Sequence, residues 1–167
     1  RLLRRWVSQP LLDVRQIRER QQAVAALARE TSARVRLREL LGSVADVERL
    51  VNRVVTGAAG PRELASLGRS LSVLPGVRRT VEDISDLRAF AAVPDCEAFV
   101  RLIQAALVDD PPGVLGQAPA IRPGFDTELD ALRSTSREAR GWIAELERAE
   151  RERTGIRSLK VGYNKVF

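Results

Sequence analysis

Residues 125–154 read FDTELDALRSTSREARGWIAELERAERERT, a stretch of thirty residues without a proline. Small and apolar side chains recur in it at alternating steps of four and three residues, a heptad register that lasts about three heptads. They are Phe125, Leu129, Leu132, Ser136, Ala139, Ile143 and Leu146. This register predicts a single helix that, at about 1.5 Å per residue, is roughly 45 Å long and extends beyond a compact domain of this size.

The end of this stretch predicts a solvated helix tip followed by a strand. Residues 145–153 are charged except for Leu146 and Ala149, and Glu147 and Arg151 have the spacing of an ion pair on one helix face. A lone strand leaves its backbone groups unpaired, so we expect its partner strands beyond residue 167. The strand is predicted from an alternation after Gly155, in which Leu159, Val161, Tyr163 and Phe167 face one way and Lys160, Gly162, Asn164 and Val166 face the other.

The residues before position 124 are patterned as shorter helices. Asp13, in a capping box with Gln16, and Asp46 are predicted N-caps, whereas Gly42 is a predicted left-handed C-cap. Four prolines and three glycines within 109–124 predict a long irregular connection. Helices are expected at about 13–29, 33–41 and 47–55. A row of leucines predicts a further helix, which begins at Pro61 and stops at Pro75-Gly76 and which we call the leucine seam. Two more helices are expected, one from Val77 that includes Leu87 and one that includes Phe99 to Leu107.

Together these patterns predict an all-α chain in three parts. They are a helical core at 1–123, a long projecting helix at 124–156, and a short terminal β-strand within 157–167 that begins a truncated second unit. The start at Arg1, without Met or a signal peptide, indicates a piece of something longer. The longest apolar run, 23–28, is far below the roughly 18 residues of a membrane span, so we expect a soluble chain.

The amino-acid composition excludes several kinds of catalytic group, metal site and cross-link. The 167 residues include no His, no Met and one Cys, which excludes an imidazole base, a His-ligated zinc and a disulfide within the chain. Cys96 follows a predicted helix start and is expected to be a small buried hydrophobe. The segment 57–60, GAAG, lacks the Lys and the hydroxyl of a phosphate-binding loop, so we expect no ATPase activity.

The positive charge is concentrated at the N-terminal end. Lys and Arg number 28 against 22 Asp and Glu, a net charge of +6, and residues 1–40 carry ten arginines and four acids. Only Lys160 and Lys165 are lysines. The arginine bias has two interpretations that the sequence leaves open, genomic base composition and phosphate binding.

Several blocks of this sequence resemble the MutS family of DNA mismatch-recognition proteins, in its core and lever region. The resemblance covers essentially all 167 residues in the right order. Trp6 and Leu12, in the first block, are expected to be core residues. The blocks are 1–13 (RLLRRWVSQPLLD), IRER at 17–20 with Ala23-Val24, DVERL at 46–50 with Arg53, PREL at 61–64 with Leu67, ELDALR at 128–133, and ERERTGI at 150–156 with LKVGYN at 159–164.

The resemblance implies that the chain is the family's domain III up to the start of its clamp. It implies an intact parent that binds double-stranded DNA, forms a homodimer, contacts a MutL-type protein, and is bacterial, cytoplasmic and nucleoid-associated, without a membrane. ATP and magnesium are expected in an ATPase domain of that parent, so no catalytic, cofactor-binding or metal-binding residue is expected here. The fragment itself is expected to bind duplex weakly or not at all, as a lever that positions the clamp.

Three residues are the candidates for contact with the DNA backbone. Lys160 and Asn164 lie on the polar face of the predicted strand, and Lys165 follows them. Mixed Lys and Asn surfaces are typical of phosphate contacts, which fix position without reading sequence. A solvated strand edge also favours Lys, so the ordinary structural interpretation stays open.

Two other function classes fit the sequence. The heptad register is compatible with a helical scaffold or coiled-coil interaction module without a DNA role, although Ser136 and Ala139 weaken an isolated coiled coil. The net charge of +6 is compatible with an autonomous nucleic-acid binder of about 10⁻⁴ to 10⁻⁶ M affinity for duplex. The aromatic content of 4% is too low for stacking along a single strand.

Overall fold

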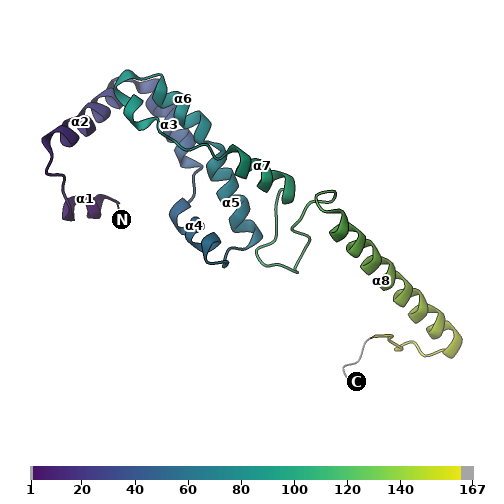
Figure 1. Ribbon diagram of the computed structural model, residues 1–167. Coiled ribbons are helices and arrows are strands. Elements are labelled where there is room, and N and C mark those ends of the chain that lie inside the picture. Colours follow the sequence, from purple (N-terminus) through teal and green to yellow (C-terminus); the bar gives the residue numbers. More distant parts are fainter. Residues whose placement is uncertain (1, 163–167) are drawn as a thin grey trace. The chain divides into compact units, whose positions relative to one another are not determined.

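The computed structural model describes residues 2–162, and the side chains of all of these except residues 2, 3, 5 and 89 (Figure 1). The described residues form helices and no sheet, which confirms the all-α class; an isolated antiparallel bridge joins Leu107 to Ile121. In chain order the elements are α1 (Leu2–Ser8), α2 (Val14–Arg29), α3 (Thr31–Gly42), α4 (Val47–Val55), α5 (Pro61–Ser72), α6 (Leu74–Glu82), the 3-10 helix η1 (Ser85–Phe90), α7 (Glu97–Ala106) and α8 (Thr127–Thr154).

The chain divides into two compact units, Arg1–Ile121 and Arg122–Phe167. In the first unit, α2 and α3 pack with α6 and η1, and α5 packs against both α4 and α7 (Figure 1). Contacts between α5 and α6 join these two groups of helices. The first group encloses buried Ala26, Leu37, Val81 and Leu87, and the second buries Leu50, Ala65, Leu67 and Val100.

Aspartates begin the helices where the sequence predicts them. The Asp46 carboxylate accepts from the N–H of Arg49 at 3.0 Å, which confirms this N-cap. Asp13 also caps its helix, but it accepts from the N–H of Arg15 at 2.8 Å, one residue earlier than the predicted capping box requires. Short polar side chains therefore satisfy the first free amides of these helices.

Two predictions about helix ends need correction. Helix α3 ends at Gly42 as predicted, but Gly42 lacks the positive φ of a left-handed cap. Ser43 stays in the right-handed region, and its N–H and hydroxyl donate to the carbonyl of Leu40. The Pro75-Gly76 pair does not end the leucine seam: α5 ends at Ser72, and Pro75 lies in the first turn of α6, where its missing N–H costs no hydrogen bond. The helix predicted from Val77 accordingly ends at Glu82, and η1 follows it.

The predicted core positions at the N-terminal end are also wrong. Leu12 is 90% exposed, and Trp6 is 47% exposed with the guanidinium of Arg20 4.6 Å from its ring centroid. A guanidinium over an indole face is a favourable cation–π contact that partly covers the ring. Among the described residues, no helix packs over α1 to bury these side chains.

Helices α5 and α7 approach each other closely at Gly68. A Cβ atom added at this buried glycine would lie 2.9 Å from Cγ2 of Ile103. The branch at the Ile103 Cβ restricts its χ1 angle, so this methyl group has little freedom to move aside. The absence of a side chain at Gly68 is therefore a condition for the packing of α5 on α7.

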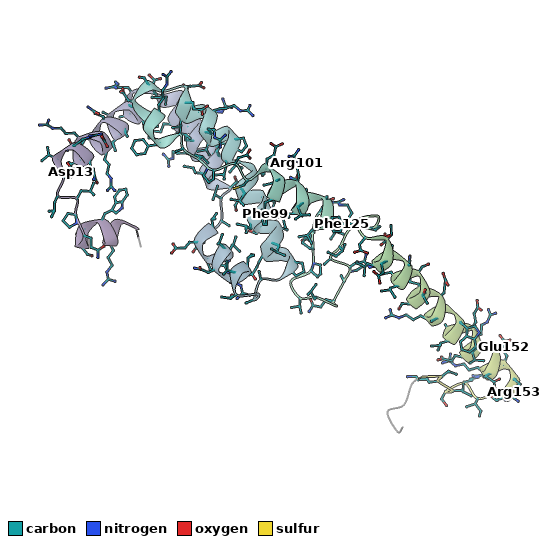
Figure 2. The ribbon with its side chains drawn as sticks, in the orientation of Figure 1. Asp13, Phe99, Arg101, Phe125, Glu152 and Arg153 are labelled. Carbon is teal, nitrogen blue, oxygen red and sulfur yellow. The ribbon has the colours of Figure 1, made fainter. Side chains whose placement is uncertain are left out.

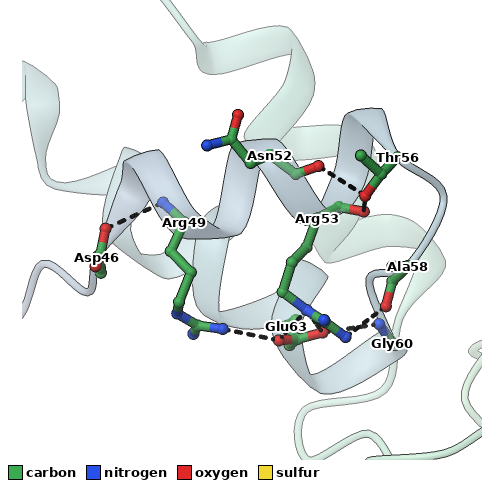
Figure 3. Close-up of polar contacts among 8 residues, drawn as sticks. All are labelled: Asp46, Arg49, Asn52, Arg53, Thr56, Ala58, Gly60 and Glu63. Carbon is green, nitrogen blue, oxygen red and sulfur yellow. Dashed lines mark hydrogen bonds and ion pairs between the residues drawn. The ribbon is translucent and has the colours of Figure 1, made fainter.

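A polar corner between α4 and α5 is built on Glu63, which is the third residue of α5 (Figure 3). Its carboxylate accepts from Nε of Arg53 at 2.8 Å, from Nη1 of Arg49 at 3.1 Å and from the N–H of Gly60 at 3.1 Å. Arg53 also donates to the carbonyl of Ala58 at 2.5 Å. The contact with Arg53, followed by those with Gly60 and Arg49, lowers the pKa of Glu63 to about 2.

The second unit contains the predicted long helix as α8. Asp126 caps it by accepting from the N–H of Leu129 at 2.9 Å, and Gly155 ends it with a left-handed φ of 70°. None of the side chains of α8 is buried, and Phe125 and Leu132 of the heptad register are 44% and 63% exposed. Figure 2 labels Phe125 just before this helix and Glu152 and Arg153 on its last turn.

The predicted terminal strand is not observed within the described residues. Residues 155–162 form turns and irregular backbone, and Tyr163 to Phe167 lie outside the part of the chain that the structure describes. A strand requires a partner for its backbone groups, and residues 2–162 contain no strand to pair with it.

The close approach at Gly68 predicts that Gly68→Ala lowers the free energy of unfolding by about 1–3 kcal/mol, because the added methyl group must displace Ile103. Gly42→Ala is the matched control, since Gly42 is also helical but has no heavy atom within 4 Å of an added Cβ. This control should be neutral or stabilising by up to about 1 kcal/mol. Urea unfolding measures both variants, and an equal effect of the two would contradict the packing described here.

The Glu63 corner predicts a specific loss of stability in acid. Because folding lowers the pKa of Glu63 from 4.5 to about 2, its contribution is present above pH 4.5 and is lost as pH falls from there toward 2. Glu63→Gln should therefore lower the urea midpoint at pH 7, and the difference from the unsubstituted chain should shrink at pH 3. Arg53→Gln should remove more of this pH dependence than Arg49→Gln. Parallel pH profiles for the unsubstituted chain and Glu63→Gln would refute the assignment.

Candidate nucleic-acid interface

One of the three predicted backbone-contacting residues lies in the described part of the chain. The side chain of Lys160 is exposed, whereas Asn164 and Lys165 lie outside the described residues. The structure therefore describes the surroundings of Lys160 alone among the three candidates. The contact of these three residues with DNA stays a prediction.

The position of Lys160 follows from the way in which α8 ends. The N–H of Gly155 donates to the carbonyl of Arg151 at 2.9 Å, and the left-handed φ of Gly155 turns the chain out of the helix. A second turn follows, in which the N–H of Leu159 donates to the carbonyl of Ile156 at 3.2 Å. These turns bring residues 159–161 back alongside the last turns of α8 (Figure 1).

Two side chains of α8 bind the backbone of this returning segment. Glu147 and Arg151 form the ion pair predicted from their spacing, through Oε1 and Nη2. Nε of Arg151 donates to the carbonyl of Leu159 at 2.8 Å, and Oε2 of Glu147 accepts from the N–H of Val161 at 3.2 Å. We call Glu147 and Arg151 the backbone clip, because together they bind the backbone on both sides of Lys160.

The exposure of the segment alternates as the sequence predicts. Leu159 and Val161 are half-buried, whereas Lys160 and Gly162 are exposed. The alternation is present although the segment is not paired as a strand, because the backbone clip binds the groups that a neighbouring strand would otherwise satisfy. The exposed side chain of Lys160 therefore has its ammonium group in solvent, where the group can bind an anion.

A second ion pair lies one turn further along α8 and differs from the clip. Glu150 accepts from Nε and Nη2 of Arg153 at 2.9 and 2.7 Å. The hydrogen bond from Arg153 lowers the pKa of Glu150, and the same bond raises the pKa of Arg153. These hydrogen bonds join the two side chains to each other, whereas the clip also binds the backbone of Leu159 and Val161, so the Glu150–Arg153 pair stabilises α8 itself.

The backbone amides of the glycine-containing corner at 57–60 have hydrogen-bond partners within the chain. The N–H of Gly57 donates to Val54, and the N–H groups of Ala58 and Ala59 both donate to the carbonyl of Arg53. The N–H of Gly60 donates to Glu63. The amides that would bind a phosphate are therefore already paired within the corner.

A metal ion requires a group of ligating side chains that lie close together. Among residues 2–162, His, Cys, Asp and Glu side chains form no group of three or more that could hold a metal ion. Cys96 is half-buried rather than fully buried, as a free thiol directly before α7. No helix in the described part of the chain is both long and apolar enough to span a membrane.

Sequence reasoning missed the backbone contacts that Glu147 and Arg151 make. The spacing of Glu147 and Arg151 predicts their ion pair, but many such pairs are exposed and bind nothing else. The return of the chain depends on the turns after Gly155, whose direction the sequence does not specify. Gly155 was the only signal, because a glycine after a helix favours a sharp change of direction.

Comparison with known proteins places the chain in a family. A family model described as MutS domain III matches residues 1–159. The chain is 45% identical over 170 residues to a protein of Symbiobacterium thermophilum named DNA mismatch repair protein MutS, and 46% identical to a protein of the same name from a Synechococcus species. A MutS protein of Salinibacter ruber is 44% identical over 171 residues.

These alignments cover all of this chain and 19% of each of the three relatives. The chain thus spans about a fifth of the length of the mismatch repair proteins that it matches. A match of this extent and identity, together with the all-α fold, identifies the family. The chain belongs to the MutS family, and residues 1–159 match its domain III.

Proposed function

We propose that this chain is the non-enzymatic hub and lever of a longer DNA mismatch repair protein. In this proposal, the helices of the first unit link the ATPase domain of that protein to its clamp, and α8 positions the clamp on duplex DNA. Membership of the MutS family supports the proposal, as does the name that the three relatives share. The whole-chain alignments favour this function over a coiled-coil module without a DNA role.

The observation that carries the proposal is the continuity of α8. It extends over 28 residues, which corresponds to about 42 Å at about 1.5 Å per residue. A long helix of this kind converts a small rotation at one end into a large displacement at the other. It is therefore suited to couple a nucleotide site to a distant DNA site.

The end of α8 supports contact with the DNA backbone in particular. Lys160 is exposed directly after the helix, and Asn164 and Lys165 follow it in the sequence. In the proposal, these side chains donate to phosphate oxygens and fix the position of the clamp on the duplex. Because phosphates are the same in every base pair, such contacts do not distinguish mismatched from matched DNA.

ATP and magnesium belong to another domain in this proposal. The corner at 57–60 has its amides paired internally and carries no Lys, so it does not fit a nucleotide phosphate. We further propose that the whole protein forms a homodimer and contacts a MutL-type protein.

Lys160→Ala combined with Lys165→Ala, made in the full-length protein, tests the DNA contact. The double variant should bind matched and mismatched duplex more weakly by a similar factor, and the salt slope should fall by about one for each lost phosphate contact. Fluorescence anisotropy titrations at several salt concentrations measure both quantities. A matched control is Arg140→Ala with Arg148→Ala, which removes the same charge from exposed positions of α8 and should have a smaller effect. A loss confined to mismatched DNA would contradict phosphate contact.

A further inference from the structure

We propose that Glu147 and Arg151, the backbone clip, are positioning residues that fix Lys160 for contact with a DNA phosphate. The inference rests on the proposed function, because it assigns to these residues a role in the same interface. Neither residue would touch DNA. Their effect would be to tie the first residues after α8 to the helix, so that the orientation of the helix sets the position of Lys160.

The clip has a closed geometry in which each side chain makes two contacts. One carboxylate oxygen of Glu147 pairs with Arg151, and the other accepts from the N–H of Val161 at 3.2 Å. One nitrogen of the Arg151 guanidinium pairs with Glu147, and Nε donates to the carbonyl of Leu159 at 2.8 Å. Each side chain therefore orients the other, which lowers the entropy that each loses on binding the backbone.

The two backbone groups flank Lys160. In extended backbone, the carbonyl of one residue and the N–H of the residue two positions later lie on the same edge of the chain. Binding of the Leu159 carbonyl and the Val161 N–H to α8 thus fixes both peptide groups that connect to Lys160. The side chain between them is exposed, as phosphate contact requires.

The clip is also more protected from solvent than the Arg15–Glu19 ion pair of α2. The side chains of Glu147 and Arg151 are 25% and 40% exposed, compared with 51% and 86% for Glu19 and Arg15 on α2. Reduced exposure strengthens an ion pair because water and salt screen it less.

An exchange of the two charges separates the ion pair from its backbone contacts. Glu147→Arg with Arg151→Glu keeps an ion pair at the same spacing, but Arg at 147 cannot accept from the Val161 N–H and Glu at 151 cannot donate to the Leu159 carbonyl. The matched control is Glu150→Arg with Arg153→Glu. It places a carboxylate in the same last turn of α8, with the same unfavourable helix-dipole interaction. It affects a pair whose hydrogen bonds join its two side chains and not the backbone of residues 159–161.

The first measurement is hydrogen exchange of the Val161 amide in the 167-residue chain. The Glu147→Arg, Arg151→Glu variant should raise the hydrogen-exchange rate of the Val161 amide by about two- to tenfold, the range expected for loss of one hydrogen bond. The Glu150→Arg, Arg153→Glu control should leave this rate unchanged. Circular dichroism should show the same helix content in both variants. An unchanged rate for Val161 in the clip variant would overturn the inference, whatever the DNA binding of the full-length protein.

The second measurement is duplex binding by the full-length protein at several salt concentrations. The Glu147→Arg, Arg151→Glu variant should weaken duplex binding by about two- to tenfold and reduce its salt slope. In a Lys160→Ala background, the same two substitutions should have little further effect on binding. A purely structural effect would weaken binding equally in both backgrounds and would overturn the inference. Faster Val161 exchange with unchanged DNA binding would also overturn it, while the Lys160 and Lys165 variants test the proposed function separately.

Discussion

Within the described residues, α8 has no buried side chain and is stabilised by its own contacts. None of its side chains is buried, so its continuity depends on backbone hydrogen bonds, on the caps at Asp126 and Gly155, and on ion pairs within the helix. Residues with strong helix propensity, mainly Glu, Arg, Ala and Leu, make up most of its sequence. The proposed lever, the returning segment and the backbone clip all depend on this self-sufficiency, because each needs a rigid element to which it can be attached.

The first unit depends instead on packing and on one polar corner. Asp46, Arg49, Arg53 and Glu63 belong to two blocks that resemble the MutS family, and the structure brings them together at the junction of α4 and α5 (Figure 3). Their contacts are with one another and with the backbone. This part of the resemblance is therefore explained by the folding of the hub, whereas the last blocks of the chain contain the candidate contacts with DNA.

Sequence reasoning located elements well where local chemistry decides them. Asp46 and the proline-free stretch at 125–154 predict a cap and a long helix that the structure contains, because capping and helix propensity act over a few residues. It failed where the outcome depends on distant residues. Trp6 was expected in the core, but burial needs a partner element that spacing does not reveal. The return of the chain onto Glu147 and Arg151 likewise depends on turns that follow Gly155, and the predicted strand needs a partner.

The most direct test is the distance between two spin labels on α8 in the full-length protein. Labels at Glu128→Cys and Glu152→Cys are separated by 24 residues of this helix. Cys96 and any cysteine outside residues 1–167 are replaced by Ser first. Double electron–electron resonance should give a narrow distribution that corresponds to about 36 Å between the two backbone sites, with and without duplex DNA. A broad distribution, or a separation below about 30 Å, would show that α8 is not one continuous helix and would contradict its role as a lever.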